Sequence, residues 1–175
     1  MKKSMVISVL GDDTPGLVES LSKLIVSHDG DWIESRMASL AGKFAGILSI
    51  DLPSSNIESF KTALLAAKDL GLQVLFEESH ELSSVQEKQH FKIELLGQDQ
   101  PGIIHKISSA LAQIHANVDE LHTEVIEASM SGESLFKANI ELHIAADIDS
   151  NQIQDQLEEI ANELIVDIEL LPHDG

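Results

Sequence analysis

The sequence carries LGDDTPGLVESLSKLI at Leu10–Ile25 and LGQDQPGIIHKISSALA at Leu96–Ala112. Both stretches begin with Leu-Gly-x-Asp-x-Pro-Gly and continue with apolar residues spaced about 3.6 residues apart, the period of an amphipathic helix. The two copies lie 86 residues apart, so the chain contains an internal repeat. The loop alone is compatible with an anion-binding site, a catalytic turn or an amino-acid pocket, and the rest of the chain has to decide.

Strands surround each loop and helix. MVISVL at residues 5–10 and FKIELL at residues 91–96 lead into the two loops and are rich in apolar residues, as strands are. Extended segments begin again at Asp31 and Asn117, at the same distance from the proline of the preceding loop. The repeat therefore extends well beyond the loop itself.

The remainder of each copy follows one order: a turn, a strand of alternating character, a helix and a closing strand. These segments lie at 41–42, 44–52, 56–70 and 72–78 in the first copy and at 131–132, 136–144, 150–163 and 164–170 in the second. Each half thus reads βαββαβ, an α+β ferredoxin-like plan with two helices on one face of a four-stranded antiparallel sheet. We expect domains at 1–78 and 90–175, a polar linker at 79–89, and the two halves packed together, so that the second copy in the same chain supplies the cover for a helix-free face.

The helix starts are expected to differ. Pro15 and Pro101 fit the first helical turn, where a missing N–H costs nothing. Thr14 is the expected N-cap of the first helix. Gln100 is a poorer cap, which predicts a looser start for the second helix.

The composition limits the classes of function. Of 175 residues, 30 are Asp or Glu and 11 are Lys or Arg, a net charge of −19, so the chain lacks the basic surface that binds nucleic acid or anionic membranes. The absence of Cys removes disulfides, zinc–thiolate sites and thiol nucleophiles. No signal peptide or membrane-spanning stretch is recognisable. These features predict a soluble, cytoplasmic protein, and a homodimer is compatible with them.

The Gly-x-Asp-x-Pro-Gly loop has two interpretations. It lacks the glycine spacing of a dinucleotide loop and the Lys-Ser/Thr of a Walker loop, and an Asp beside a phosphate is unfavourable. Free N–H groups at a helix N-terminus can instead hold a small carboxylate, with Asp13 or Asp99 facing the ammonium end of an amino acid. Alternatively, Gly, Asp and Pro form only a turn. The residues leave both interpretations open.

No catalytic or metal-binding motif is recognisable. The eight histidines form no His-Glu-x-x-His pattern, and no Gly-x-Ser-x-Gly elbow occurs. His105 and His122 have no matching histidines in the first copy and are interpreted as surface residues. Arg36 beside Glu34 is interpreted as a surface ion pair. We therefore expect no catalytic residue, no metal site and no cofactor.

The repeated loop, joined to an Asn or Asp at the start of the second strand, resembles tandem ACT domains, a small-molecule regulatory module of amino-acid metabolism. LGDDTPGLV followed by WIESRMASLAGKFAGILSI is also similar to the family of glycine cleavage system transcriptional repressors, which consist of two ACT domains. This resemblance implies a non-enzymatic regulator that binds a small amino acid, glycine, and represses glycine cleavage genes. It also implies contact with a DNA-bound activator rather than with DNA.

The resemblance further implies that a ligand lies between the first loop of one ACT domain and the second-strand start of its neighbour. The matching positions here are Gly11, Asp13, Pro15, Gly16, Gly97, Asp99, Pro101, Gly102, Asp31 and Asn117. Asn117 matches the Asn that is common at the strand start. Asp31 departs from it, and Trp32 stands where a small aliphatic residue is commoner, so we expect the two copies to bind unequally.

Two other functions remain open. A stand-alone regulatory subunit of a metabolic enzyme would use the same sensor chemistry with another protein target. A small hydrolase or isomerase on a ferredoxin-like scaffold would need converging acid–base groups, and the sequence shows only scattered histidines.

Overall fold

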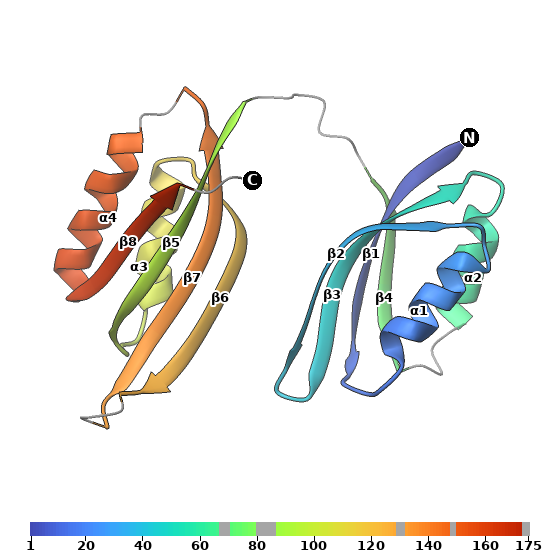
Figure 1. Ribbon diagram of the computed structural model, residues 1–175, viewed down its shortest axis with the longest axis horizontal. Helices are drawn as coiled ribbons and strands as arrows, with labels where there is room; N and C mark the ends of the chain where they lie inside the picture. The colour runs from blue at the N-terminus through green and yellow to red at the C-terminus, as the bar shows by residue number, and fades with distance from the viewer. Residues whose placement is uncertain (67–70, 80–86, 129–131, 148–149, 173–175) are drawn as a thin grey trace. The chain divides into compact units, whose positions relative to one another are not determined.

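Two units make up the chain, Met1–Ser83 and Ser84–Gly175 (Figure 1). The computed structural model describes residues 1–66, 71–79, 87–128, 132–147 and 150–172. The expected tandem of two ferredoxin-like, βαββαβ units is confirmed. The division between the units falls inside the segment expected as the linker.

The first unit follows the expected order of elements. They are β1 (Lys2–Asp12), α1 (Leu17–Val26), β2 (Asp31–Leu40), β3 (Lys43–Pro53), α2 (Ile57–Ala66) and β4 (Gln73–Glu78). The strands are antiparallel and lie in the order β2-β3-β1-β4. The last residues of the helix expected at 56–70, residues 67–70, lie outside the described ranges.

The second unit repeats this order. Its elements are β5 (Lys88–Gln98), α3 (Ile103–Gln113), β6 (Asn117–Glu127), β7 (Ser134–Ala145), α4 (Ser150–Leu164) and β8 (Val166–Pro172). The strands are again antiparallel, in the order β6-β7-β5-β8. β5 begins at Lys88, two residues before the expected start of the second domain. Of the turn expected at 131–132, residue 131 lies outside the described ranges.

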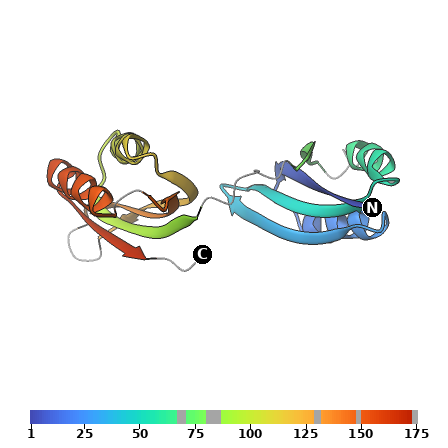
Figure 2. The same ribbon diagram turned by 90° about the horizontal axis from the view of Figure 1, so that it is seen from above.

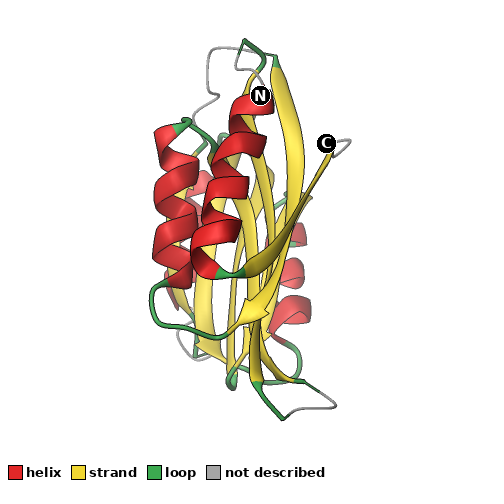
Figure 3. Cartoon of the chain, turned by 90° about the vertical axis from the view of Figure 1, so that its left-hand side faces the viewer, coloured by secondary structure: helices red, strands yellow, loops and turns green. Residues whose placement is uncertain are grey.

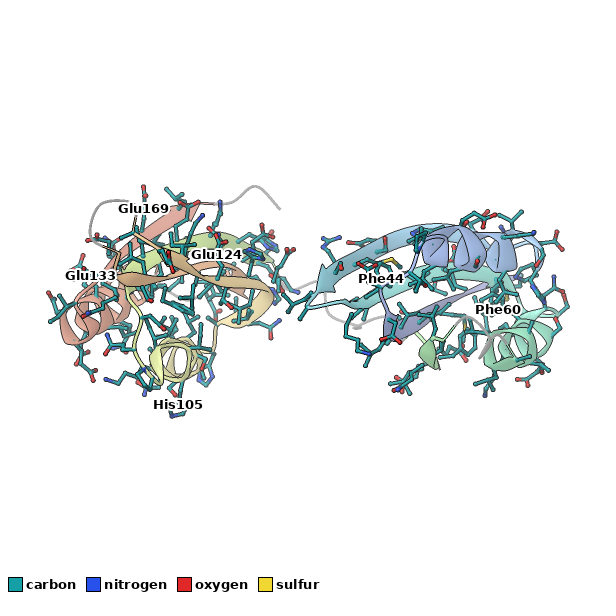
Figure 4. All side chains as sticks on the ribbon, turned by 90° about the horizontal axis from the view of Figure 1, so that it is seen from below. Phe44, Phe60, His105, Glu124, Glu133 and Glu169 are labelled. Atoms are coloured by element: carbon teal, nitrogen blue, oxygen red, sulfur yellow. The ribbon has the colours of Figure 1, made fainter. Side chains whose placement is uncertain are left out.

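Each unit has its own hydrophobic core between its sheet and its helices. In β1, Met5, Ile7 and Val9 alternate with less buried residues, so one face of the strand lies against the helices. Phe60 of α2 is fully buried in the first core (Figure 4). In the second unit, α3 and α4 lie on one side of the curved sheet and run side by side along its strands (Figures 2 and 3). The described core contains no buried polar or charged residue.

Both helices after the repeated loops begin on a glycine rather than on a polar cap. Gly16 and Gly102 are the N-cap residues, with φ of 91° and 86°, and neither helix start carries a side-chain cap. The expected N-cap at Thr14 and the expected helical Pro15 are therefore wrong. Glycine adopts this left-handed conformation without a Cβ penalty, so the chain turns into the helix only after the proline. Both starts have one cap geometry, and the first helical bond is 2.9 Å long in the first helix and 3.1 Å long in the second.

The helix-free faces of the two sheets differ in chemistry. The helix-free face of the first sheet carries Val6, Ile47 and Leu75, and the side chains of Ile47 and Leu75 are 54% and 69% exposed. A hollow of about 180 Å³ opens beside Val6 and Ile47. The corresponding hollow in the second unit is lined by charged residues of three strands, among them Glu94 and Glu169, together with apolar residues such as Leu96. Apolar side chains gain from being covered, whereas charged ones lose hydration. The exposed apolar side chains therefore favour a cover on the first sheet more strongly than on the second.

Candidate functional site

Each Gly-x-Asp-x-Pro-Gly loop is fixed at one end of its sheet and opens a helix. The backbone N–H of Asp13 donates to the carbonyl of Gly42 (3.0 Å), and that of Asp99 donates to the carbonyl of Ser134 (3.1 Å). The first helical bonds run back to the carbonyls of Gly16 and Gly102. The N–H groups of the first turn precede these bonds, and neither helix start has a side-chain cap. In the second helix the N–H of Ile103 already donates to the carbonyl of Gln100 (3.4 Å), and the N–H groups that follow it can donate to a small anion.

The first glycine of each loop has a packing role. A Cβ on Gly97 would lie 2.2 Å from Cγ1 of Val166, at the start of β8. A Cβ on Gly11 would lie 2.7 Å from the carbonyl oxygen of Gly71. Only a residue without a Cβ fits here, because the chain at or just before the start of the last strand packs directly against the loop glycine. Close packing at the edge of the sheet therefore explains why these two positions are glycine.

The second glycine of each loop faces open space. A Cβ on Gly16 or Gly102 would meet no other atom within 4 Å. Their positive φ values, rather than contacts within the protein, explain the choice of glycine at these positions. The space in front of the helix N-termini is therefore accessible to a ligand.

The two loop carboxylates have different surroundings. Ser39 Oγ donates to Asp13 Oδ2 at 2.5 Å, so Asp13 is engaged within the first unit. At the position of the second repeat that corresponds to Ser39 stands Val125, which has no hydroxyl to donate. Asp99 consequently lacks that partner and is exposed.

The loops and the second-strand starts lie at opposite ends of each sheet. Asp31 pairs with Asp51 of β3, which pairs with Ser4 near the beginning of β1, whereas the loop follows Asp12 at the end of β1. Asp12 lies eight positions after Ser4 along the strand, about 26 Å away at a rise of roughly 3.3 Å per residue. One unit cannot offer its own loop and its own strand start to a single amino acid.

The two strand starts also differ from each other. Asp31 forms an ion pair with the ammonium of Lys2, and this hydrogen bond raises the pKa of Lys2 above its ordinary value. Asn117 is exposed and pairs with His143 across β6 and β7. An amide can donate and accept at once, whereas the Asp31 carboxylate already binds a cation.

The structure also brings together residues that the sequence motifs did not single out. His90, Asp119 and His143 form a cluster on the second sheet. His105 and His122 do not belong to this cluster: His105 lies on the outer side of α3, opposite Glu169 across the sheet (Figure 4), and both histidines are exposed, as the sequence predicted. The expected ion pair of Arg36 and Glu34 is present at 2.9 Å and is exposed. No short sequence motif signals a three-strand cluster.

Comparison with known proteins identifies the domain. A family model for the ACT domain matches residues 3–77 and 89–170. The crystal structure of an unknown protein from Galdieria sulphuraria superposes with a TM-score of 0.88 and 27% identity, over 99% of this chain and 100% of that one. The structure of a proposed glycine cleavage system transcriptional repressor superposes with a TM-score of 0.72 and 19% identity, over 100% of this chain and 99% of that one. No curated protein matches the sequence significantly.

The family match covers both βαββαβ units and includes both loops and both second strands. ACT domains generally bind amino acids, which supports an amino-acid-sensing, regulatory role. Across the described ranges, no helix is long and apolar enough to cross a membrane. The chain belongs to the ACT domain family and contains two ACT domains in tandem.

Proposed function

We propose that this chain is a non-enzymatic, cytoplasmic regulator that binds glycine and represses glycine cleavage genes by contacting a DNA-bound activator. The match of both units to the ACT domain carries the proposal. The solved structure of the proposed glycine cleavage repressor has the same two-domain plan over its full length. The net charge of −19 favours contact with a protein over contact with DNA.

The second unit is proposed to be the stronger binding site. The first turn of α3 contains no acidic residue, whereas that of α1 contains Glu19, which disfavours a carboxylate at the same helix end. Asp99 lacks the hydroxyl that engages Asp13 and remains available to an ammonium group. These differences agree with the expectation that the two copies bind unequally.

Each group has a defined role in this proposal. The N–H groups that follow Ile103 in the first turn of α3 bind the carboxylate of the amino acid, and the carboxylate of Asp99 binds its ammonium group. Asn117 adds an amide contact to an amino acid, but not to one held by the loop of its own unit, because the two lie about 26 Å apart by strand rise. Loop and strand start therefore have to be tested separately.

Calorimetry of the full-length chain against the twenty amino acids, beginning with glycine, tests the ligand. Asp99→Asn removes the charge partner of the ammonium and should weaken binding by about tenfold, since a hydrogen bond to a charged group contributes roughly 1.5–3 kcal/mol. Asp13→Asn is the matched control in the first loop and should have a smaller effect. Equal effects of the two variants contradict the assignment to the second unit, and absence of binding to every amino acid contradicts the sensor proposal.

The transcriptional part needs its own measurement. Affinity capture with the full-length chain as bait, with and without glycine, should retain an activator of glycine cleavage genes. Capture of a metabolic enzyme instead, with glycine binding intact, would favour the regulatory-subunit alternative.

A further inference from the structure

Three side chains from three neighbouring strands meet on the helix-free side of the second sheet. His90 of β5 pairs directly with His143 of β7, so both imidazoles project from the same face, with ring centroids 5.7 Å apart. Asp119 of β6 lies at a register shift between Val118 and Glu120. The extra residue at this bulge brings a carboxylate to the two imidazoles.

Both histidines face that one carboxylate with a ring nitrogen. His143 Nδ1 lies 2.7 Å from Asp119 Oδ1 and 2.8 Å from Oδ2, and His90 Nδ1 lies 3.9 Å from Oδ2. One potential ligand atom from each residue lies within 4.8 Å of the other two. A hydrogen bond explains the approach of His143 to Asp119, whereas His90 Nδ1 lies too far from Oδ2, at 3.9 Å, for a hydrogen bond.

The spacing suits a metal ion. Zinc bonds to His nitrogen and carboxylate oxygen measure roughly 2.0–2.2 Å, so ligand atoms in a tetrahedral site lie about 3.3 Å from one another. The observed separations of 2.7 Å and 3.9 Å lie on either side of this value, and small side-chain rotations would equalise them. The charge also fits, because the Asp119 carboxylate offsets part of the charge of a divalent ion.

We propose that His90, Asp119 and His143 bind a divalent transition metal ion such as Zn²⁺, with three protein ligands and open positions for water or a small molecule. Imidazole with carboxylate is a ligand set that such ions accept. The side chains of His90 and Asp119 are 35% and 36% exposed, so an ion can reach the site from solvent. His143 is the inner ligand, at 15% exposure.

The first repeat provides an internal comparison. Its counterparts are Ser4, Ile33 and Asp51, and Ile33 occupies the matching bulge between Trp32 and Glu34. Ser4 Oγ donates to Asp51 Oδ1 at 2.5 Å, and no imidazole is present. The bulge is thus common to both sheets, whereas the three ligands occur in the second only.

The experiment uses the full-length chain after treatment with a chelator. Calorimetric titration with Zn²⁺, and the visible absorption of added Co²⁺, should show one bound ion per chain. His90→Ala, Asp119→Asn and His143→Ala should each weaken Zn²⁺ binding at least about 10- to 100-fold, since loss of an outer-shell partner alone has effects of that size. His122→Ala, a histidine on the same sheet outside the cluster, should leave the affinity unchanged.

Two further measurements separate a site from an ion pair. In the unmodified chain, Zn²⁺ should shift the imidazole NMR signals of His90 and His143 but not those of His122, a readout that requires no variant. The triple variant H90S/D119I/H143D, which copies the first repeat, should keep its circular dichroism spectrum and lose binding. Absence of binding in the unmodified chain, or equal binding in the triple variant, would overturn the proposal.

Discussion

Asn117 lies directly opposite His143 across β6 and β7, whereas its counterpart Asp31 lies opposite Asp51 and binds Lys2. The two repeats thus have the same backbone at the second-strand start and different chemistry. In the first unit, a carboxylate is neutralised by a lysine. In the second, a neutral amide is exposed, and it is available to a ligand.

Asn117→Ala should weaken amino-acid binding more than Asp31→Ala does. The lost amide contacts to a charged ligand contribute roughly 1.5–3 kcal/mol, which corresponds to about tenfold or more in Kd. Both positions are exposed, so both variants should fold. Calorimetry with glycine measures the difference, and an unchanged affinity of Asn117→Ala would exclude this residue from the site.

Gly97→Ala should destabilise the second unit more than Gly102→Ala does. At position 97 the new Cβ overlaps Val166 at 2.2 Å, and overpacking costs typically about 1–3 kcal/mol. At position 102 the Cβ meets open space and only the left-handed backbone is penalised, by about 1–2 kcal/mol. Thermal unfolding provides the comparison. In the double variant Gly97→Ala/Val166→Ala, the cost of the two changes should be less than additive, and full additivity would argue against the contact.

Phe60→Ala should strongly destabilise the first unit. Phe60 is fully buried, touches the edge of His28 at a centroid distance of 5.4 Å and lies 5.7 Å from Phe76. Removing a buried phenylalanine side chain costs about 3–5 kcal/mol. Chemical denaturation should show the lower free energy of unfolding, and amide hydrogen exchange in β1 and β3 should be faster in the variant. Leu65→Ala, at an exposed position of the same helix, is the control and should change stability little.

The pair of Lys92 and Glu94 predicts a dependence on pH. The hydrogen bond from Lys92, at 2.6 Å, lowers the pKa of Glu94 below its ordinary value of 4.5. A carboxyl group whose pKa is lower in the folded state than in the unfolded state stabilises the fold at pH values above its unfolded-state pKa. This contribution is lost as the pH falls through the folded-state pKa. Lys92→Met should return the pKa of Glu94 toward 4.5, as measured by NMR titration of its carboxyl carbon. An unchanged pKa would show that the ion pair does not persist in solution.

The isolated chain should not bind duplex DNA at physiological salt. With a net charge of −19 it lacks the clustered cations that give even non-specific binders Kd values of roughly 10⁻⁴–10⁻⁶ M. A gel shift with purified protein should show no complex. A salt-sensitive complex in that range or tighter would contradict both this prediction and the proposed route through an activator.

The fold could be predicted from the sequence because its signals are local. The alternation in β1 and the helical period after the loops need only neighbouring residues, and a second copy confirmed each assignment. The starts at Asp31 and Asn117 were also predicted to the residue. The N-cap residues were not predicted correctly, because a polar residue directly before a proline, such as Thr14, has the sequence pattern of an N-cap. The backbone places the turn at glycine instead.

The sequence by itself determined the element order, the repeat and the residues of the two loops, since periodicity and turn chemistry act within a few positions. Only the tertiary structure decided which side chains meet. Strand pairing brings His143 to Asp119 across 24 positions of sequence, and a one-residue bulge, which leaves no sequence signature, directs Asp119 toward the histidines. Pairing also engages Asp31 with Lys2, 29 positions away. Contacts of this kind depend on register between distant strands, and register is set by the packing of the whole sheet.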